Sequence, residues 1–253
     1  MMSRTRLEIR SSIPARGKIA VWWLGGSGFL LALDTGERIC IDPYLSDCVE
    51  RIAGFRRLMP APFKAGDLEF SFLLLTHSHP DHLDVDSFDT FIETNPGCRV
   101  IAPADCLSFL LERNAAHEIT APGKIHRFGS LVIEATPADH ADLSPEAVGY
   151  ILDVSGRSIW FTGDTALNWD ILESSINRKP DILVPCINSA YGNLGERGAA
   201  LLAGKCGAHV VIPAHYGMFK EHGGDAALFH TYMKELSPHA TVYIHSPGEG
   251  LEI

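Results

Sequence analysis

The feature that most constrains this chain is an apolar segment that ends in a cluster of metal-binding side chains. Residues 73–75 are all leucine, and after one threonine the chain reads His-Ser-His-Pro-Asp-His. Side chains two apart on an extended segment project to the same side, so His77 and His79 are placed to share one ion. Asp81 and His82, at the following turn, are placed to reach a neighbouring ion. A polar surface turn has no need of this spacing, and the pattern predicts a metal site.

Four ligands do not complete two metal sites, and three further candidates occur later in the chain. His140, Asp164 and His215 each come shortly after an apolar segment. Functional sites gather where the ends of parallel or mixed strands meet. Singly, a His or Asp in a turn is more often a cap or a solvated residue than a ligand. Together with the histidine-rich motif, they predict one shared site.

Short apolar segments and helical periodicities alternate along the chain, which predicts an α/β fold with two sheets. Nothing between the halves has the composition of a linker, so we expect a single domain over 1–253. We expect helices at Asp84–Thr94, Ala104–Asn114, Asn168–Asn177, Glu196–Cys206 and Gly224–Leu236. The expected strands, besides the leucine segment, are Lys18–Leu24, Gly28–Asp34, Arg38–Asp42, Leu131–Thr136, Val148–Val154, Ser158–Thr162, Asp181–Cys186, His209–Pro213 and Thr241–His245.

Composition and charge exclude several classes of protein. With 31 acidic against 21 basic side chains among 253 residues, the net charge is -10, which argues against a protein that grips nucleic acid through a broad basic surface. No apolar run approaches the roughly 20 residues of a membrane helix, and the polar start has no signal core. Six scattered cysteines form no C-x-x-C pair, so we expect buried free thiols and a cytoplasmic protein.

The order of these motifs resembles the metallo-β-lactamase superfamily: H-x-H-x-D-H, a later His, an Asp after Gly, and a final His. The resemblance spans roughly residues 20–245 and implies a four-layer αβ/βα sandwich of two mixed sheets with a dinuclear site at one edge. It implies one ion held by His77, His79 and His140, a second held by Asp81, His82 and His215, and Asp164 as the bridge between them. A set of nitrogen and oxygen ligands without cysteine suits two divalent ions, Zn²⁺ or Mn²⁺, and also Fe.

Local matches within the superfamily are most similar to the L-ascorbate-6-phosphate lactonase branch and its metal-dependent hydrolase relatives. These matches are Val21–Gly25, Asp42–Leu45, Arg57–Pro62, Thr76–Asp84 and Ile212–His215. The resemblance implies hydrolysis by a metal-bound hydroxide of a small cyclic ester, which is a lactone or a sugar-phosphate lactone. Asp164 and Asp81 are then the catalytic carboxylates, with Asp81 orienting the hydroxide. The lactonase resemblance is also consistent with a homo-oligomer.

Four residues near strand ends are candidates for contact with a small-molecule substrate or for proton donation: Asn188, Tyr191, Tyr216 and His222. Taken alone, each is better explained by structural hydrogen bonds, which are the commoner role of loop Tyr and Asn. Arg51, Arg56 and Arg57 form a basic group that is either a solvated face or a phosphate contact. Trp22 and Trp23 adjoin on a strand, so one should face a core and the other the opposite face.

Two other functions share this motif. A phosphodiesterase or nuclease on the same dinuclear scaffold is the main alternative, although the chain lacks a basic surface and has no room for an added RNA-binding domain. A non-catalytic binding module would have lost ligands, whereas this chain retains all seven. Hydrolysis of a small molecule is therefore the favoured hypothesis.

Overall fold

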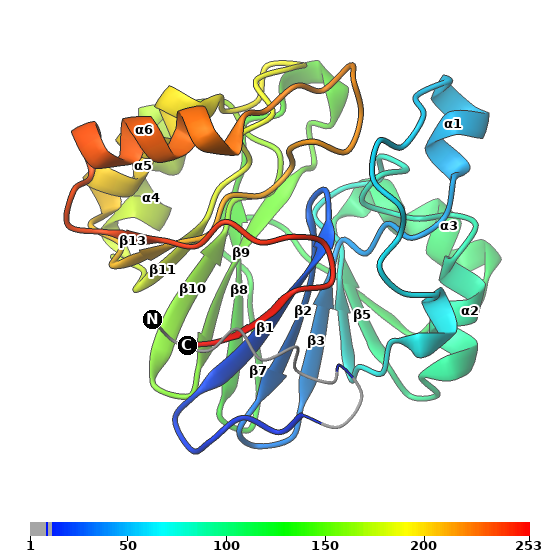
Figure 1. Ribbon diagram of the computed structural model, residues 1–253. Coiled ribbons are helices and arrows are strands. Elements are labelled where there is room, and N and C mark those ends of the chain that lie inside the picture. The colour runs from blue at the N-terminus through cyan, green and yellow to red at the C-terminus, as the bar shows by residue number, and fades with distance from the viewer. Residues whose placement is uncertain (1–8, 10–11) are drawn as a thin grey trace.

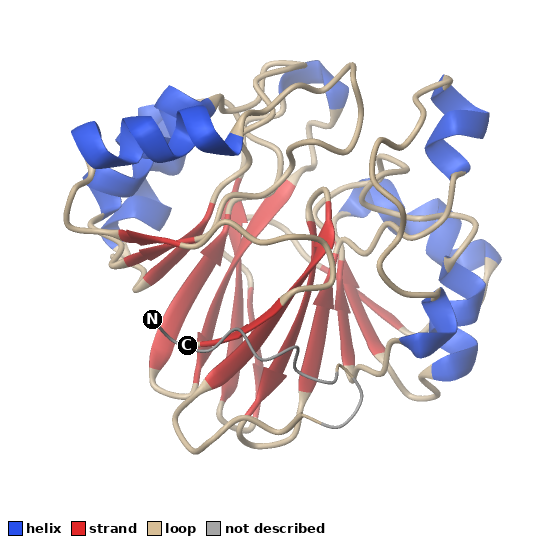
Figure 2. Ribbon diagram, in the orientation of Figure 1, coloured by secondary structure: helices blue, strands red, loops and turns tan. Residues whose placement is uncertain are grey.

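Two seven-stranded sheets pack face to face in the computed structural model, which describes Ile9 and residues 12–253. Helices cover the two outer sides of this pair, as Figure 1 and Figure 2 show. Each sheet contains both parallel and antiparallel pairs. The prediction of an α/β sandwich with two mixed sheets is confirmed.

The first sheet has the strand order β14-β1-β2-β3-β4-β5-β6. Pairs from β14 to β3 are antiparallel, and pairs from β3 to β6 are parallel. The strands are β1 (Ile19–Gly25), β2 (Gly28–Leu33), β3 (Arg38–Ile41), β4 (Phe72–Leu74), β5 (Arg99–Ala102), β6 (His117–Ile119) and β14 (Gly250–Glu252).

The second sheet repeats this plan in the order β13-β12-β11-β10-β9-β8-β7. An antiparallel meander from β7 to β10 leads into parallel pairs from β10 to β13. The strands are β7 (Ile125–Phe128), β8 (Leu131–Pro137), β9 (Val148–Val154), β10 (Arg157–Phe161), β11 (Ile182–Val184), β12 (Val210–Val211) and β13 (Thr241–Val242).

The helices divide between the two outer faces. Helices α2 (Phe88–Thr94) and α3 (Leu107–Glu112) pack on the first sheet, and α4 (Trp169–Asn177), α5 (Glu196–Cys206) and α6 (Ala226–Leu236) pack on the second. Helix α1 (Cys48–Ala53) stands apart at the top of the view in Figure 1. Three 3₁₀ turns complete the set at Ala65–Asp67, Ala104–Cys106 and Ala141–Leu143. Within the described part of the chain, none of the helices has the length and apolar character needed to span a membrane.

Alternation along the strands places apolar side chains in two kinds of core. Trp23 lies between the sheets, while Trp22 faces the helices on the outer side of the first sheet, as predicted from their adjacency. Burial of both faces explains why β1 and β2 read as nearly continuous apolar runs. The six cysteines are all buried and free, which confirms the expected thiols.

The structure corrects several predicted boundaries. The helix expected at 84–94 begins only at Phe88, because Asp84 accepts backbone hydrogen bonds from Leu45 and Ser46 in a turn. The strands expected at 181–186, 209–213 and 241–245 are shorter than predicted. Helix α1 and strands β5, β6, β7 and β14 were not predicted; they are three to six residues long, and several carry charged side chains.

One side chain joins the two sheets by a buried hydrogen bond. Tyr150 of β9 donates its hydroxyl to the carbonyl of Leu75, at 2.7 Å, and the same oxygen lies 3.2 Å from the carbonyl of Ile101. We expect Tyr150→Phe to lower the free energy of unfolding by about 1–2 kcal/mol, because the buried carbonyl of Leu75 loses its hydroxyl donor. Urea unfolding measures this, with Tyr232→Phe on α6 as the control. Equal midpoints for the two variants would contradict the prediction.

Candidate metal centre

All seven predicted ligands lie at one end of the sandwich, in loops that follow four different strands. The segment His77–His82 follows β4, and His140, Asp164 and His215 follow β8, β10 and β12 in turn. The first sheet therefore supplies one loop and the second sheet supplies three. The face-to-face packing of the sheets is what brings these loops together.

Three histidines form the first group. Nδ1 of His79 lies 2.9 Å from Nε2 of His77 and 3.4 Å from Nε2 of His140. A neutral imidazole carries one N–H, so three ring nitrogens that face one point leave lone pairs without a proton. A cation at that point would satisfy all three, and these residues therefore fit a divalent ion.

The second group contains a carboxylate and two histidines. Nε2 of His215 lies 3.2 Å from Nε2 of His82 and 3.3 Å from Oδ2 of Asp81. Asp164 lies between the two groups: its Oδ2 is 3.3 Å from Nε2 of His215, and its Oδ1 is 3.5 Å from Nε2 of His82. Asp164 also forms a potential ligand set with His77 and His82. This placement suits a residue shared by two ions.

The histidines of the cluster differ in the direction in which their pKa values are shifted. Burial lowers the pKa of His77 well below its usual range and also lowers that of His140, so both rings are neutral. Burial acts in the same direction on His215, but the carboxylates of Asp164 and Asp81 outweigh it and raise the pKa of His215 to about 9. Without a metal ion, protons on such histidines balance the buried carboxylates; a bound cation would replace these protons.

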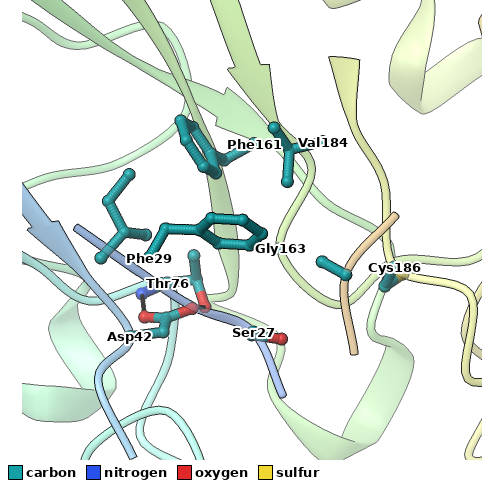
Figure 3. Close-up of a pocket in the computed structure, with 10 residues that line it drawn as sticks. Ser27, Phe29, Asp42, Thr76, Phe161, Gly163, Val184 and Cys186 are labelled. Atoms are coloured by element: carbon teal, nitrogen blue, oxygen red, sulfur yellow. Dashed lines mark hydrogen bonds between the residues drawn. The ribbon is translucent and has the colours of Figure 1, made fainter. Parts of the chain in front are cut away.

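Hydrogen bonds to a further carboxylate, that of Asp42, hold the histidine-rich motif in place. Asp42, directly after β3, accepts hydrogen bonds from the backbone N–H of Thr76 at 2.8 Å, its hydroxyl at 2.6 Å, and Nδ1 of His82 at 2.8 Å. This arrangement leaves Nε2 of His82 facing the cluster. Figure 3 shows the contact between Asp42 and Thr76, beside a cavity of about 10 Å³ that the rings of Phe29 and Phe161 also line.

The backbone is strained where the loops approach the cluster. Asp42 and His215 adopt positive φ angles of 43° and 57°, which residues other than glycine rarely do. Gly163 also has a positive φ, of 63°, and a Cβ there would lie 2.6 Å from the carbonyl oxygen of Val148. Only glycine fits before Asp164, which explains the Gly-Asp sequence.

An open cavity of about 220 Å³ lies over the cluster, and His79, Asp81, His140 and Asp164 form its floor. Of the predicted substrate-contacting residues, three line this cavity: Asn188, Tyr191 and His222. The structure does not bring Tyr216 to it. The Tyr216 ring stacks on Trp23 with centroids 4.7 Å apart, and its hydroxyl donates to the carbonyl of His245.

Sequence reasoning did not assign a role to several residues at the site. Asn193 donates from Nδ2 to Oδ2 of Asp164 at 2.6 Å, and Phe55 lines the cavity. Asp42 was noted only as part of a matching segment. An aspartate that ends a buried strand was an available signal for Asp42, but Asn193 and Phe55 lie in irregular segments with no such signal.

Comparison with known proteins finds one family model and a group of metal-dependent hydrolases that are similar to this chain. The sequence pattern of the beta-lactamase superfamily domain matches residues 37–216. A UPF0173 metal-dependent hydrolase of Caldivirga maquilingensis is 27% identical over 235 residues, which cover 91% of this chain and 96% of that protein.

Two solved structures are similar to this one. Igni18, a metallo hydrolase from Ignicoccus hospitalis, has a TM-score of 0.74 and 22% identity, covering 93% of this chain and 98% of its own. An isothiocyanate hydrolase from Delia radicum gut bacteria has a TM-score of 0.73 and 18% identity, covering 92% and 98%. At these identities, the two structures show that the fold is shared.

Replacing Asp42 tests whether it positions His82. We expect Asp42→Asn to weaken Zn²⁺ binding by about 10- to 100-fold, because residues that orient metal-ligating histidines have effects of that size. Competitive titration with a chelating dye measures the affinity. Asp181→Asn is the matched control, since Asp181 likewise accepts from a backbone N–H and a hydroxyl, both of Ser158. Affinities that are equal in both variants would show that Asp42 has no such role.

Proposed function

The chain belongs to the metallo-β-lactamase superfamily, and from that premise we propose that it is a metal-dependent hydrolase of small esters, with lactones as the leading substrate class. The observation that carries this proposal is the convergence of seven nitrogen and oxygen ligands beneath an open cavity. The name of the Caldivirga relative, a metal-dependent hydrolase, supports the same activity.

Two divalent ions are the proposed cofactors, held by the two groups of side chains with Asp164 between them. When bound, such ions act as Lewis acids that lower the pKa of water and polarise a carbonyl oxygen. All the candidate ligands are nitrogen or oxygen donors, which suits Zn²⁺ or Mn²⁺. The neutral rings of His77 and His140 are ready to ligate without losing a proton.

Asp81 is the residue proposed to orient the attacking water. It lies on the cavity floor, with its Oδ2 3.8 Å from Nδ1 of His222. Burial alone would raise its pKa, but the neighbouring His82 and His215 hold the pKa of Asp81 well below its usual range. The carboxylate therefore stays ionised and accepts a hydrogen bond from water without taking its proton.

The proposed reaction adds one water across the ester bond. The water oxygen forms a bond to the carbonyl carbon, and the bond from that carbon to the ring oxygen breaks. One proton of the water ends on the ring oxygen, which becomes a hydroxyl group, and the carbonyl carbon becomes that of a carboxylic acid. A ring-opened hydroxy acid is the product.

A substrate panel tests this function. The purified protein is analysed for metal and then assayed with Zn²⁺ or Mn²⁺ against lactones, phosphodiesters, β-lactams and an isothiocyanate, the last because one structural neighbour is named for that activity. We expect two metal equivalents and turnover of lactones above the other classes. Preferred turnover of a phosphodiester would replace the proposal with the phosphodiesterase alternative, and no turnover with both metals bound would refute it.

Asp164 provides the sharpest single substitution. We expect Asp164→Ala to lower kcat/KM by more than about 100-fold and to lower bound metal, because even residues that only orient ligands have effects of 10- to 100-fold. Circular dichroism should remain native-like, since Asp164 lies outside the apolar cores. Asp153→Ala, an exposed carboxylate paired with Arg178, is the control. Full metal content together with full activity in Asp164→Ala would rule out a bridging role.

A further inference from the structure

The walls of the cavity are chemically unlike its floor. We propose that the walls select a small, uncharged ester. The carbonyl oxygen of this ester accepts a hydrogen bond from Asn188, and its apolar substituent lies against Phe55 and Tyr191. This inference rests on the proposed hydrolase function and narrows its substrate class. It excludes phosphorylated substrates, including a sugar-phosphate lactone.

Asn188 presents hydrogen-bonding groups that no described residue satisfies. Its side chain is about 1% exposed, and neither Oδ1 nor Nδ2 has a hydrogen-bond partner within the part of the chain that the structure describes. A buried amide without partners is costly, and such groups are normally satisfied. Because Asn188 lines the cavity, a bound molecule can supply the missing partner.

The backbone fixes Asn188 in this position. It pairs with Gly195 in an isolated antiparallel bridge, and its carbonyl accepts from the N–H of Ala190 at 2.6 Å. The next residue, Ser189, has a positive φ of 53°, as does Tyr191. A strained and tightly bonded loop that holds an unsatisfied amide side chain in the lining of a cavity is typical of a ligand-binding position.

Apolar side chains also line the cavity. Val49, Ala53 and Phe55 come from α1 and the turn after it, and Leu143 and Tyr191 come from loops beside the cluster. The rings of Phe55 and Tyr191 stack with centroids 6.4 Å apart. Tyr191 is 48% exposed and Leu143 is 49% exposed, so an apolar ligand group would remove this surface from water.

In the part of the chain that the structure describes, the cavity lacks the basic side chains that usually bind a phosphate. No Lys or Arg is among its lining residues, whereas two aspartates are. Arg57 does not line the cavity: its Nη1 donates to the carbonyls of Tyr44 and Ser46, its guanidinium lies over the Tyr44 ring at 4.7 Å, and its Nη2 is buried without a partner among the described residues. Arg51 pairs with Asp86 on the surface. Phosphate recognition in proteins relies on such cations, and these walls provide none.

Cavity size also limits the substrate. A volume of about 220 Å³ lies below the roughly 300–1,000 Å³ that is usual for drug-sized ligands. A lactone ring with one phenyl or short alkyl substituent is of suitable size.

Binding of a non-hydrolysable analogue tests the assignment apart from turnover. The probe is 5-phenyl-2-pyrrolidinone, a lactam, and calorimetry on the metal-loaded protein gives its Kd. We expect Kd to rise about 10-fold in Asn188→Ala, which removes the amide, and about 10-fold in Phe55→Ala, which removes the apolar wall. Phe109→Ala on α3, which is half-buried against the other side of the first sheet, should bind as the wild type does. Should Asn188→Ala not fold, Asn188→Leu fills the space without hydrogen-bonding groups.

A second, phosphorylated probe distinguishes failure of this inference from failure of the hydrolase proposal. We expect the phosphate ester of 5-hydroxymethyl-2-pyrrolidinone to bind at least about 10-fold more weakly than the phenyl probe. Tighter binding of the phosphorylated probe, or unchanged Kd in Asn188→Ala and Phe55→Ala, would overturn the assignment even if esters are hydrolysed. Conversely, binding that depends on both residues without turnover of any ester would support the pocket assignment while the hydrolase function fails.

Discussion

The hydrogen bonds of Asp42 are the interaction on which the candidate centre depends. This carboxylate ends β3, yet its partners are Thr76 and His82 in the loop after the neighbouring strand β4. Parallel pairing of β3 with β4 brings the two strand ends level, so that a short side chain spans the gap. Since His82 contacts the second sheet's His215 and Asp164, its orientation sets how the two halves of the site meet. The geometry of the cluster therefore depends on the pairing of β3 with β4 through Asp42.

Packing between the sheets supplies the second condition. One loop of the first sheet must meet three loops of the second, and the core between them fixes their distance. Gly163 allows one of these approaches, because a Cβ there would lie 3.2 Å from Cβ of Thr76 in the first sheet's loop, besides 2.6 Å from the carbonyl oxygen of Val148. Strained backbone at Asp42 and His215 can persist because strong hydrogen bonds and packing hold both residues. Strain at these positions is consistent with a site that is formed before a metal or substrate arrives.

The sequence was most informative where a side chain that can bind metal follows an apolar segment. The seven candidate ligands could be named because each follows an apolar segment, and helix α5 was predicted with its observed bounds of Glu196–Cys206. Helix α1 and strands β5 to β7 were missed because they are short and their burial depends on distant partners. The same reason applies to Tyr216: its neighbour His215 lies in the cluster, but stacking on Trp23, nearly 200 residues earlier in the chain, directs its ring away from the cavity.

The floor and the walls of the cavity come from different parts of the fold, which matters for substrate specificity. The ligand cluster is built on strand ends that the two sheets hold rigidly, whereas the cavity walls come from α1 and the loops around Leu143 and Asn188. Substitutions in these outer segments change the shape and polarity presented to a substrate without moving a ligand. In this chain, those segments present aromatic and aliphatic groups and the unsatisfied amide of Asn188, and Arg57 is held by carbonyls outside the cavity. In the proposed hydrolase, the scaffold therefore determines which bond is broken, and the outer segments determine which molecule reaches it.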